Sequence, residues 1–118
     1  MKQQHNLYSY QYLFKISSTS PVFIKKMIAL FLNSLTEYIS DLERIIAKKD
    51  ITDLQKIIHK LKPSVLSLEI QGAKEVITLI DDTKNWNDAV QAGVERLLHT
   101  FKQIQPMMQQ DLESFREE

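Results

Sequence analysis

The 118-residue sequence is poor in the residues that build turns, cross-links and membrane spans. It has no cysteine, which excludes disulfide bonds, cysteine-ligated zinc sites and thiol catalysis. Two glycines and three prolines are too few for a turn-rich all-β fold. The longest unbroken apolar run, residues 27–32, is far too short to cross a bilayer, and the polar residues 1–6 lack the apolar centre of a secretion signal. We therefore expect a cytoplasmic protein with no membrane partner.

The sequence also has no excess of charge of either sign, because 15 lysines and arginines balance 15 aspartates and glutamates. A neutral chain argues against a dedicated nucleic-acid binder and against intrinsic disorder. The charge is nevertheless uneven along the chain: residues 1–67 carry ten basic and five acidic side chains, and residues 68–118 carry five basic and ten acidic. A basic surface is therefore available to an acidic partner.

Apolar residues recur at helical spacing in four successive segments. Ser20 and Pro21 are typical of an N-cap and a first helical residue, and Asp50 is a good cap for the next helix. Residues 8–16 form a short aromatic-rich segment that we expect to be a small helix covering the core. We expect the core to include the following apolar side chains: Ile28, Phe31, Leu35, Leu54, Ile58, Leu61, Val65, Ile77, Leu97 and Phe101.

This pattern predicts an all-α protein, an antiparallel four-helix bundle with a short extra N-terminal helix. We expect a single domain over residues 1–118, with residues 1–7 as a flexible tail, and a monomer. Pro63 and Pro106 lie inside predicted helices, where a proline costs roughly 3 kcal/mol and leaves a carbonyl without its donor. The apolar spacing continues past Pro63, so we expect a kinked helix there, whereas Pro106 should kink or end the last helix.

His59 falls on the outer face of the second long predicted helix. At ~100° per residue, its side chain points about 140° away from the centre of the apolar face. Its neighbours on the outer face are Gln55, Lys56, Lys62, Pro63 and Leu66. Taken alone, this arrangement is also that of an ordinary surface histidine on a lysine-rich helix.

The string His59-Lys60-Leu61-Lys62-Pro63-Ser64 resembles the signature of the histidine-containing phosphotransfer (HPt) domain, roughly H-x-L-K-G-S-S followed by leucine and glycine. The matching residues are His59, Leu61, Lys62, Ser64 and Leu68. The order of helices is also similar to that of the family's bundle. Among the departures from the signature, Pro63 stands at the glycine after the lysine, and Glu69 stands at the glycine after the leucine.

The resemblance implies that His59 is a phosphoacceptor and that Lys62 stabilises the phosphoryl group. It also implies docking of a receiver domain on the outer face, at Gln55, Lys56, Pro63 and Leu66. Asp81 stands where many members have a glutamine that hydrogen-bonds the active imidazole. Its carboxylate would orient the ring but also repel the phosphoryl group, or it would have only a structural or capping role.

On this reading the chain is a phosphorelay intermediate between the receiver domains of a hybrid histidine kinase and of a response regulator. It needs no cofactor or metal of its own, since the receiver supplies the Mg²⁺. It would have no kinase activity, because the sequence has no glycine-rich nucleotide loop. The alternative is a helical adaptor that keeps the bundle and has lost the transfer, which the changes at Pro63, Glu69 and Asp81 favour.

Three further residues have open interpretations. His99 lies four residues after Glu95, but two ligands do not make a metal site, so a solvated pair is expected. Trp86 is either a core-capping aromatic or a binding residue. Leu66 is either a minor core residue or an exposed docking contact.

Overall fold

The structure, a computed structural model, describes residues 7–17 and 20–114. These residues contain five helices. In order they are α1 (Gln11–Ile16), α2 (Pro21–Lys48), α3 (Ile51–Ser67), α4 (Ala73–Asp81) and α5 (Asp88–Ser114). These described residues contain no strand, so the prediction of an all-α protein is confirmed. None of the described helices is long and apolar enough to cross a bilayer.

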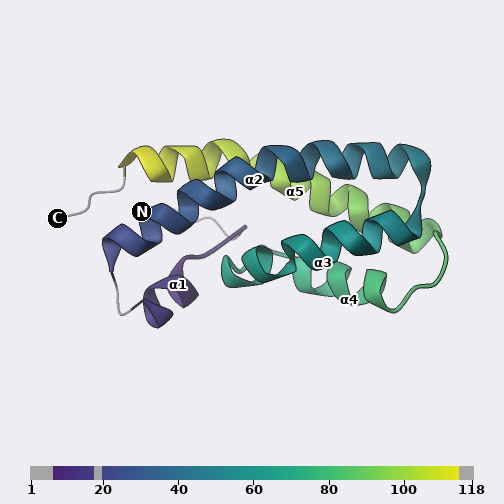
Figure 1. The fold of residues 1–118 in the computed structure, drawn as a ribbon, viewed down its shortest axis with the longest axis horizontal. Helices are drawn as coiled ribbons and strands as arrows, with labels where there is room; N and C mark the ends of the chain where they lie inside the picture. The colour runs from purple at the N-terminus through teal and green to yellow at the C-terminus, as the bar shows by residue number, and fades with distance from the viewer. Residues whose placement is uncertain (1–6, 18–19, 115–118) are drawn as a thin grey trace.

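The four main helices close into an elongated bundle. α2 packs against α3 and α5, and α4 packs against the same two helices. Consecutive main helices run in opposite directions, and α2 and α5 extend beyond the shorter α3 and α4 at one end (Figure 1). The predicted antiparallel four-helix bundle with a short N-terminal helix is confirmed.

Local side-chain chemistry sets where the long helices begin. The Ser20 hydroxyl accepts a hydrogen bond at 3.4 Å from the backbone N–H of Phe23, the third residue of α2, whose first residue is Pro21. The Asp50 carboxylate accepts two backbone N–H groups from the first turn of α3, at 3.0 and 3.2 Å. The side-chain oxygen of Asn87 accepts one such bond at the start of α5, from the backbone N–H of Val90 at 2.8 Å. Each cap satisfies donors that a helix start leaves unpaired, and the two predicted caps, Ser20 and Asp50, are both present.

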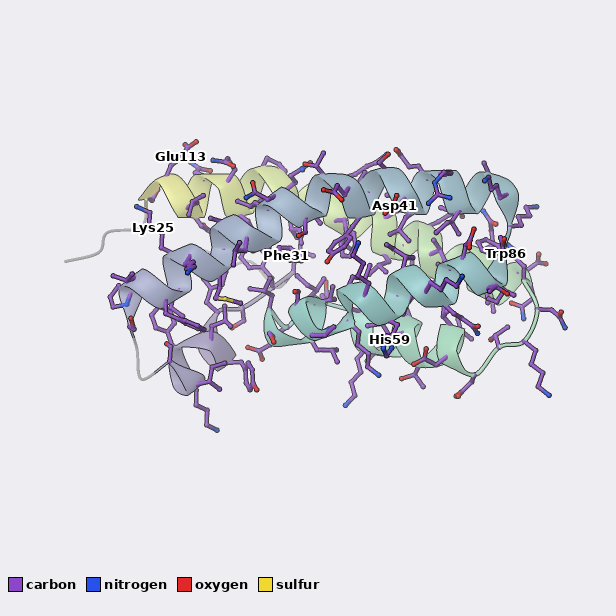
Figure 2. All side chains as sticks on the ribbon, viewed as in Figure 1. Lys25, Phe31, Asp41, His59, Trp86 and Glu113 are labelled. Carbon is purple, nitrogen blue, oxygen red and sulfur yellow. The ribbon has the colours of Figure 1, made fainter. Side chains whose placement is uncertain are left out.

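A single apolar core runs through the bundle. All ten side chains predicted to lie in it are buried, and Figure 2 shows Phe31 pointing from α2 into the interior. No polar or charged side chain is fully buried among the described residues.

Both helices that contain an interior proline continue past it. Pro63 lies inside α3, as predicted, and Pro106 lies inside α5, which excludes a helix end there. Both prolines are exposed. A residue four positions earlier lies on nearly the same side of a helix, so the carbonyl that lacks a donor is on the solvent side in each case. Water can replace the missing donor, which explains why neither helix breaks.

Residues 7–16 cover the end of the bundle that α3 and α4 leave open (Figure 1). Leu13 of α1 and Tyr8 before it are buried in the core, as expected for a small helix that covers it. The segment is also held by backbone hydrogen bonds, from Ser9 N–H to the Leu68 carbonyl at 2.9 Å and from Gln71 N–H to the Leu7 carbonyl at 2.8 Å. Residues 1–6 of the expected tail lie outside the described residues.

Candidate functional site

His59 is an exposed side chain in the middle of α3. Figure 2 shows it on the side of α3 that faces away from α2. Its neighbours Ile58 and Leu61 are both 0% exposed, so packing holds α3 in the rotation that turns His59 outward. The imidazole makes no hydrogen bond or ion pair with any part of the chain that the structure describes. A ring in this position is open to a large partner and keeps a nitrogen lone pair available.

The lysines around His59 point in different directions. Lys62 Nζ lies 3.9 Å from Asp81 Oδ2 at the end of α4, and both side chains are nearly half exposed. Because helical side chains lean toward the N-terminus, the Lys62 stem lies along the turn that holds His59. Lys56 and Lys60 instead line a groove between α2 and α3, on the other side of the helix. Lys62 is therefore the lysine best placed to reach a group bound to the imidazole.

Gln55 holds the end of α4 in register with this site. Its side-chain amide donates to the backbone carbonyls of Ile80 and Thr83, at 3.1 and 2.9 Å. The half-buried amide therefore ties the last turn of α4 to α3, one turn before His59. This contact keeps Asp81 opposite Lys62. Gln55 is predicted from its place on the outer face to take part in docking, and the structure adds a positioning contact that helical spacing does not reveal.

The sequence model of the Hpt domain matches residues 26–110, more than half of the chain. The chain belongs to the Hpt domain family. The matched range includes all of α3 and α4, and with them His59, Lys62 and Asp81. No curated protein and no solved structure matches the chain. Membership of the family implies histidine phosphotransfer in a phosphorelay and interaction with receiver domains.

In this Hpt domain, Glu69 replaces a family glycine and takes the backbone conformation that glycine favours. Its φ of 51° is left-handed. The backbone N–H groups of Glu69 and Ile70 return to the carbonyls of Leu66 and Val65, at 3.1 and 3.2 Å, which is the Schellman pattern of a helix end. A non-glycine residue in this conformation costs about 1 kcal/mol. The turn after Leu68 is thus made without glycine, at the expense of some strain.

The Glu69 side chain also has a partner. Its carboxylate accepts a hydrogen bond at 3.4 Å from the backbone N–H of Tyr12, in the first turn of α1. Tyr12 is 46% exposed and lines a shallow hollow with Leu66, Ser67 and Glu69. Leu66 is 38% exposed, so it is not a core residue, and its docking role stays a prediction. Tyr12 was not predicted as part of this surface, because only the tertiary placement of α1 brings it beside α3.

The other sequence-predicted residues lie away from this face. Trp86 packs half-buried against the core at the end of the bundle where α2 turns into α3, and its indole N–H donates to Gln91 at 2.9 Å (Figure 2). Glu95 accepts a hydrogen bond from Gln91, and His99 is exposed on α5. Within the described residues no group of three or more histidine, aspartate or glutamate side chains gathers into a metal site.

Asp81 faces Lys62 and makes no hydrogen bond to His59 in the described structure. Among the roles left open by the sequence, the observed contact is with the lysine rather than with the ring. The carboxylate also does not cap its helix, because it is the last residue of α4 and a carboxylate there faces unpaired carbonyls.

Proposed function

We propose that His59 accepts a phosphoryl group from the aspartyl phosphate of one receiver domain and passes it to the aspartate of another. The observation that carries the proposal is an exposed imidazole without a partner, held in the middle of α3 within the range that matches the Hpt family. A phosphocarrier needs such exposure, because the aspartyl phosphate of another protein has to approach the ring in line.

The bonds that change in the transfer involve only the ring nitrogen, the phosphorus and the two receiver carboxylates. The lone pair of the unprotonated imidazole nitrogen forms the N–P bond as the P–O bond to the receiver aspartate breaks. The electron pair of the broken bond stays on that carboxylate, and the ring retains the proton on its other nitrogen. The second receiver reverses these steps: its carboxylate forms a new P–O bond, and the N–P electron pair returns to the ring.

The surface around His59 supports docking of an acidic partner. The basic side chain of Lys62 lies on the His59 side of α3 and that of Lys56 on the side toward α2, and Pro63 and Leu66 provide exposed apolar contacts. We assign Lys62 to stabilisation of the transferred phosphoryl group, because its ammonium lies on the His59 side of α3 and a charged hydrogen bond to a phosphoryl oxygen is strong. Tyr12 extends the apolar part of the surface toward α1.

The test is phosphoryl transfer from receiver domains of the same organism, each loaded on its aspartate with radiolabelled acetyl phosphate. We expect at least one receiver to transfer acid-labile, alkali-stable label to the wild-type chain and none to label His59→Gln. The matched control is His99→Gln, which changes the other exposed helical histidine and should be labelled like wild type. Label retained in His59→Gln, or no label in the wild type from any receiver, would contradict the proposal.

The adaptor alternative rests on the changes at Pro63, Glu69 and Asp81, and it predicts a different kind of interaction. A carrier must release its partner after transfer, so its interface should be modest and short-lived. An adaptor should instead form a stoichiometric complex with an unphosphorylated receiver that survives gel filtration, without any transfer of label. That pair of results would replace the phosphocarrier assignment with the adaptor.

A further inference from the structure

Asp81 occupies a position that helix energetics disfavour. It is the last residue of α4, where the helix dipole places partial negative charge and where a carboxylate is destabilising. The amide of Gln55 already supplies donors to the carbonyls at this helix end. The only ion pair of Asp81 in the described structure is with Lys62, at 3.9 Å. The carboxylate therefore contributes little to the end of its own helix, and its contact is with the lysine beside His59.

We infer that Asp81 is a positioning residue, which holds Lys62 beside His59 while the ring is unphosphorylated. Once His59 carries a phosphoryl group, the Asp81 carboxylate weakens the binding of that group at the site. This inference rests on the proposed function. Asp81 thus sets how readily phosphorylated His59 gives up its phosphoryl group to the next receiver.

The ion pair is weak enough to exchange. Both side chains are nearly half exposed, at 44% for Lys62 and 48% for Asp81, and exposed pairs of this kind contribute little to stability. A phosphoryl group on His59 carries more negative charge than the carboxylate and draws the Lys62 ammonium to itself. Asp81 then loses its partner and faces a like charge. Both effects favour departure of the phosphoryl group over its retention.

A neutral side chain at this position would act in the opposite direction. It would leave Lys62 free for the phosphoryl group and would remove the repulsion. Asp81→Asn keeps the size of the side chain and removes its charge, so it should stabilise phosphorylated His59. The neighbouring Asp82→Asn is the matched control, because Asp82 is an exposed carboxylate at the same helix end that makes no ion pair in the described structure.

The experiment measures the equilibrium of label between the chain and the receiver that labels His59 most strongly. We expect Asp81→Asn to shift this equilibrium about 2- to 5-fold toward phosphorylated His59. The shift should shrink when the salt concentration rises from about 0.05 M to about 0.5 M, because salt screens exposed charges. Asp82→Asn should leave the equilibrium near that of the wild type, and Asp81→Glu should restore wild-type behaviour.

A double variant tests whether Asp81 acts through Lys62. In the Lys62→Ala background, the effect of Asp81→Asn should be smaller than in the wild type, since there is no lysine to release. If the wild type is labelled but Asp81→Asn behaves like Asp82→Asn, or if its effect is the same with and without Lys62, the inference is wrong and the phosphocarrier assignment stands. If no receiver labels the wild type, it is the proposed function that has failed.

Discussion

Polar groups are unpaired or weakly paired in one region of the described structure and well paired in another. The first region is the face of α3 that carries His59, and the second is the end of the bundle covered by residues 7–16. On the His59 face, the imidazole makes no hydrogen bond or ion pair within the described structure, and the nearby Lys62–Asp81 ion pair is long and half exposed. At the covered end, the hydroxyls of Tyr8 and Tyr10 both donate to the Asp111 carboxylate of α5, Tyr10 at 2.7 Å. The polar groups of the first region are available to another protein, and those of the second stabilise the fold.

This difference predicts that changes at the two regions separate stability from transfer. Substitutions on the His59 face should alter labelling and leave the free energy of unfolding nearly unchanged. Substitutions at the covered end, or beneath the His59 face, should lower stability and leave labelling of the folded protein intact.

The largest expected effect on stability lies directly beneath His59. Leu61 is two residues further along α3 and completely buried, so Leu61→Ala should lower the free energy of unfolding by about 2–5 kcal/mol. His59→Gln should change it by less than about 0.5 kcal/mol, because its side chain faces solvent. Urea denaturation of both variants measures the two values. Similar losses in the two variants would mean that the inner and outer faces of α3 are assigned wrongly.

The next largest effect is expected on phosphoryl transfer, when two lysines of α3 are substituted in turn. Lys62→Ala removes the charge on the His59 side of the helix, so it should slow labelling or destabilise the phosphorylated form. A lost charged contact corresponds to about 1.5–3 kcal/mol, or roughly 10- to 150-fold.

Lys60→Ala is the matched control, because Lys60 lines the groove on the other side of the helix. It should have a much smaller effect. Equal effects from the two variants would indicate that only diffuse positive charge matters on this face.

A smaller loss of stability is expected from the tyrosines of the covered end. Burial, and then the hydrogen bond to Asp111, raise the pKa of both Tyr8 and Tyr10. Removing both hydroxyls in Tyr8→Phe/Tyr10→Phe should lower the free energy of unfolding at pH 7 by about 1–2 kcal/mol, since the carboxylate loses its donors. Labelling of the folded variant should stay at the wild-type level.

The raised pKa values also give this end a pH dependence. The folded protein retains the two tyrosine protons at a pH where the unfolded chain, with a tyrosine pKa of about 10, releases them. The stabilisation is therefore complete below pH ~10 and is lost as the pH rises above it. Denaturant titrations at about pH 9 and pH 11 should show that the free energy of unfolding of the wild type falls between these pH values. The fall should be smaller in the Tyr8→Phe/Tyr10→Phe variant. Tyr12→Phe, at an exposed tyrosine of the same segment, should decline like the wild type.

The smallest effect on the free energy of unfolding is expected from substituting the two non-glycine residues between helices that have a left-handed backbone. Lys49 and Glu69 have φ values of 55° and 51°, and both should tolerate glycine well. Lys49→Gly should raise the free energy of unfolding by about 0.5–1 kcal/mol, as relief of left-handed strain outweighs the extra freedom of the unfolded chain. Glu69→Gly should give a smaller gain, because it also loses the hydrogen bond that the Glu69 carboxylate accepts from the backbone N–H of Tyr12 in α1. A larger gain at Glu69 would mean that this contact contributes nothing.

Most of the fold and the outward direction of His59 were predictable because they depend on spacing within single helices. The apolar positions Leu54, Ile58 and Leu61 determine which side of α3 is buried, and His59 then has to face solvent. The starts at Ser20 and Asp50 depend on contacts within one helical turn. Such information survives in a single sequence, since neighbours along a helix are neighbours in the chain.

The surroundings of His59 were not predictable in the same way. The contact of Gln55 with the end of α4, the pairing of Lys62 with Asp81 and the place of Tyr12 beside Leu66 each join residues of different helices. Helical spacing shows which face a side chain occupies but not which residue of another helix lies opposite it. These contacts depend on how far each helix slides along its neighbour, and packing of the whole core decides that offset.

By itself, the sequence determined the number and order of the helices, the composition of the core and the outward direction of His59, because the apolar periodicity of each helix allows one orientation toward a common interior. The tertiary structure alone decided which charged groups surround the imidazole and which residues tie the N-terminal segment to α5. Tyr10 and Asp111 are 101 positions apart, and only the closed bundle brings them within hydrogen-bonding distance. Long-range contacts of this kind follow from packing, and no local pattern encodes them.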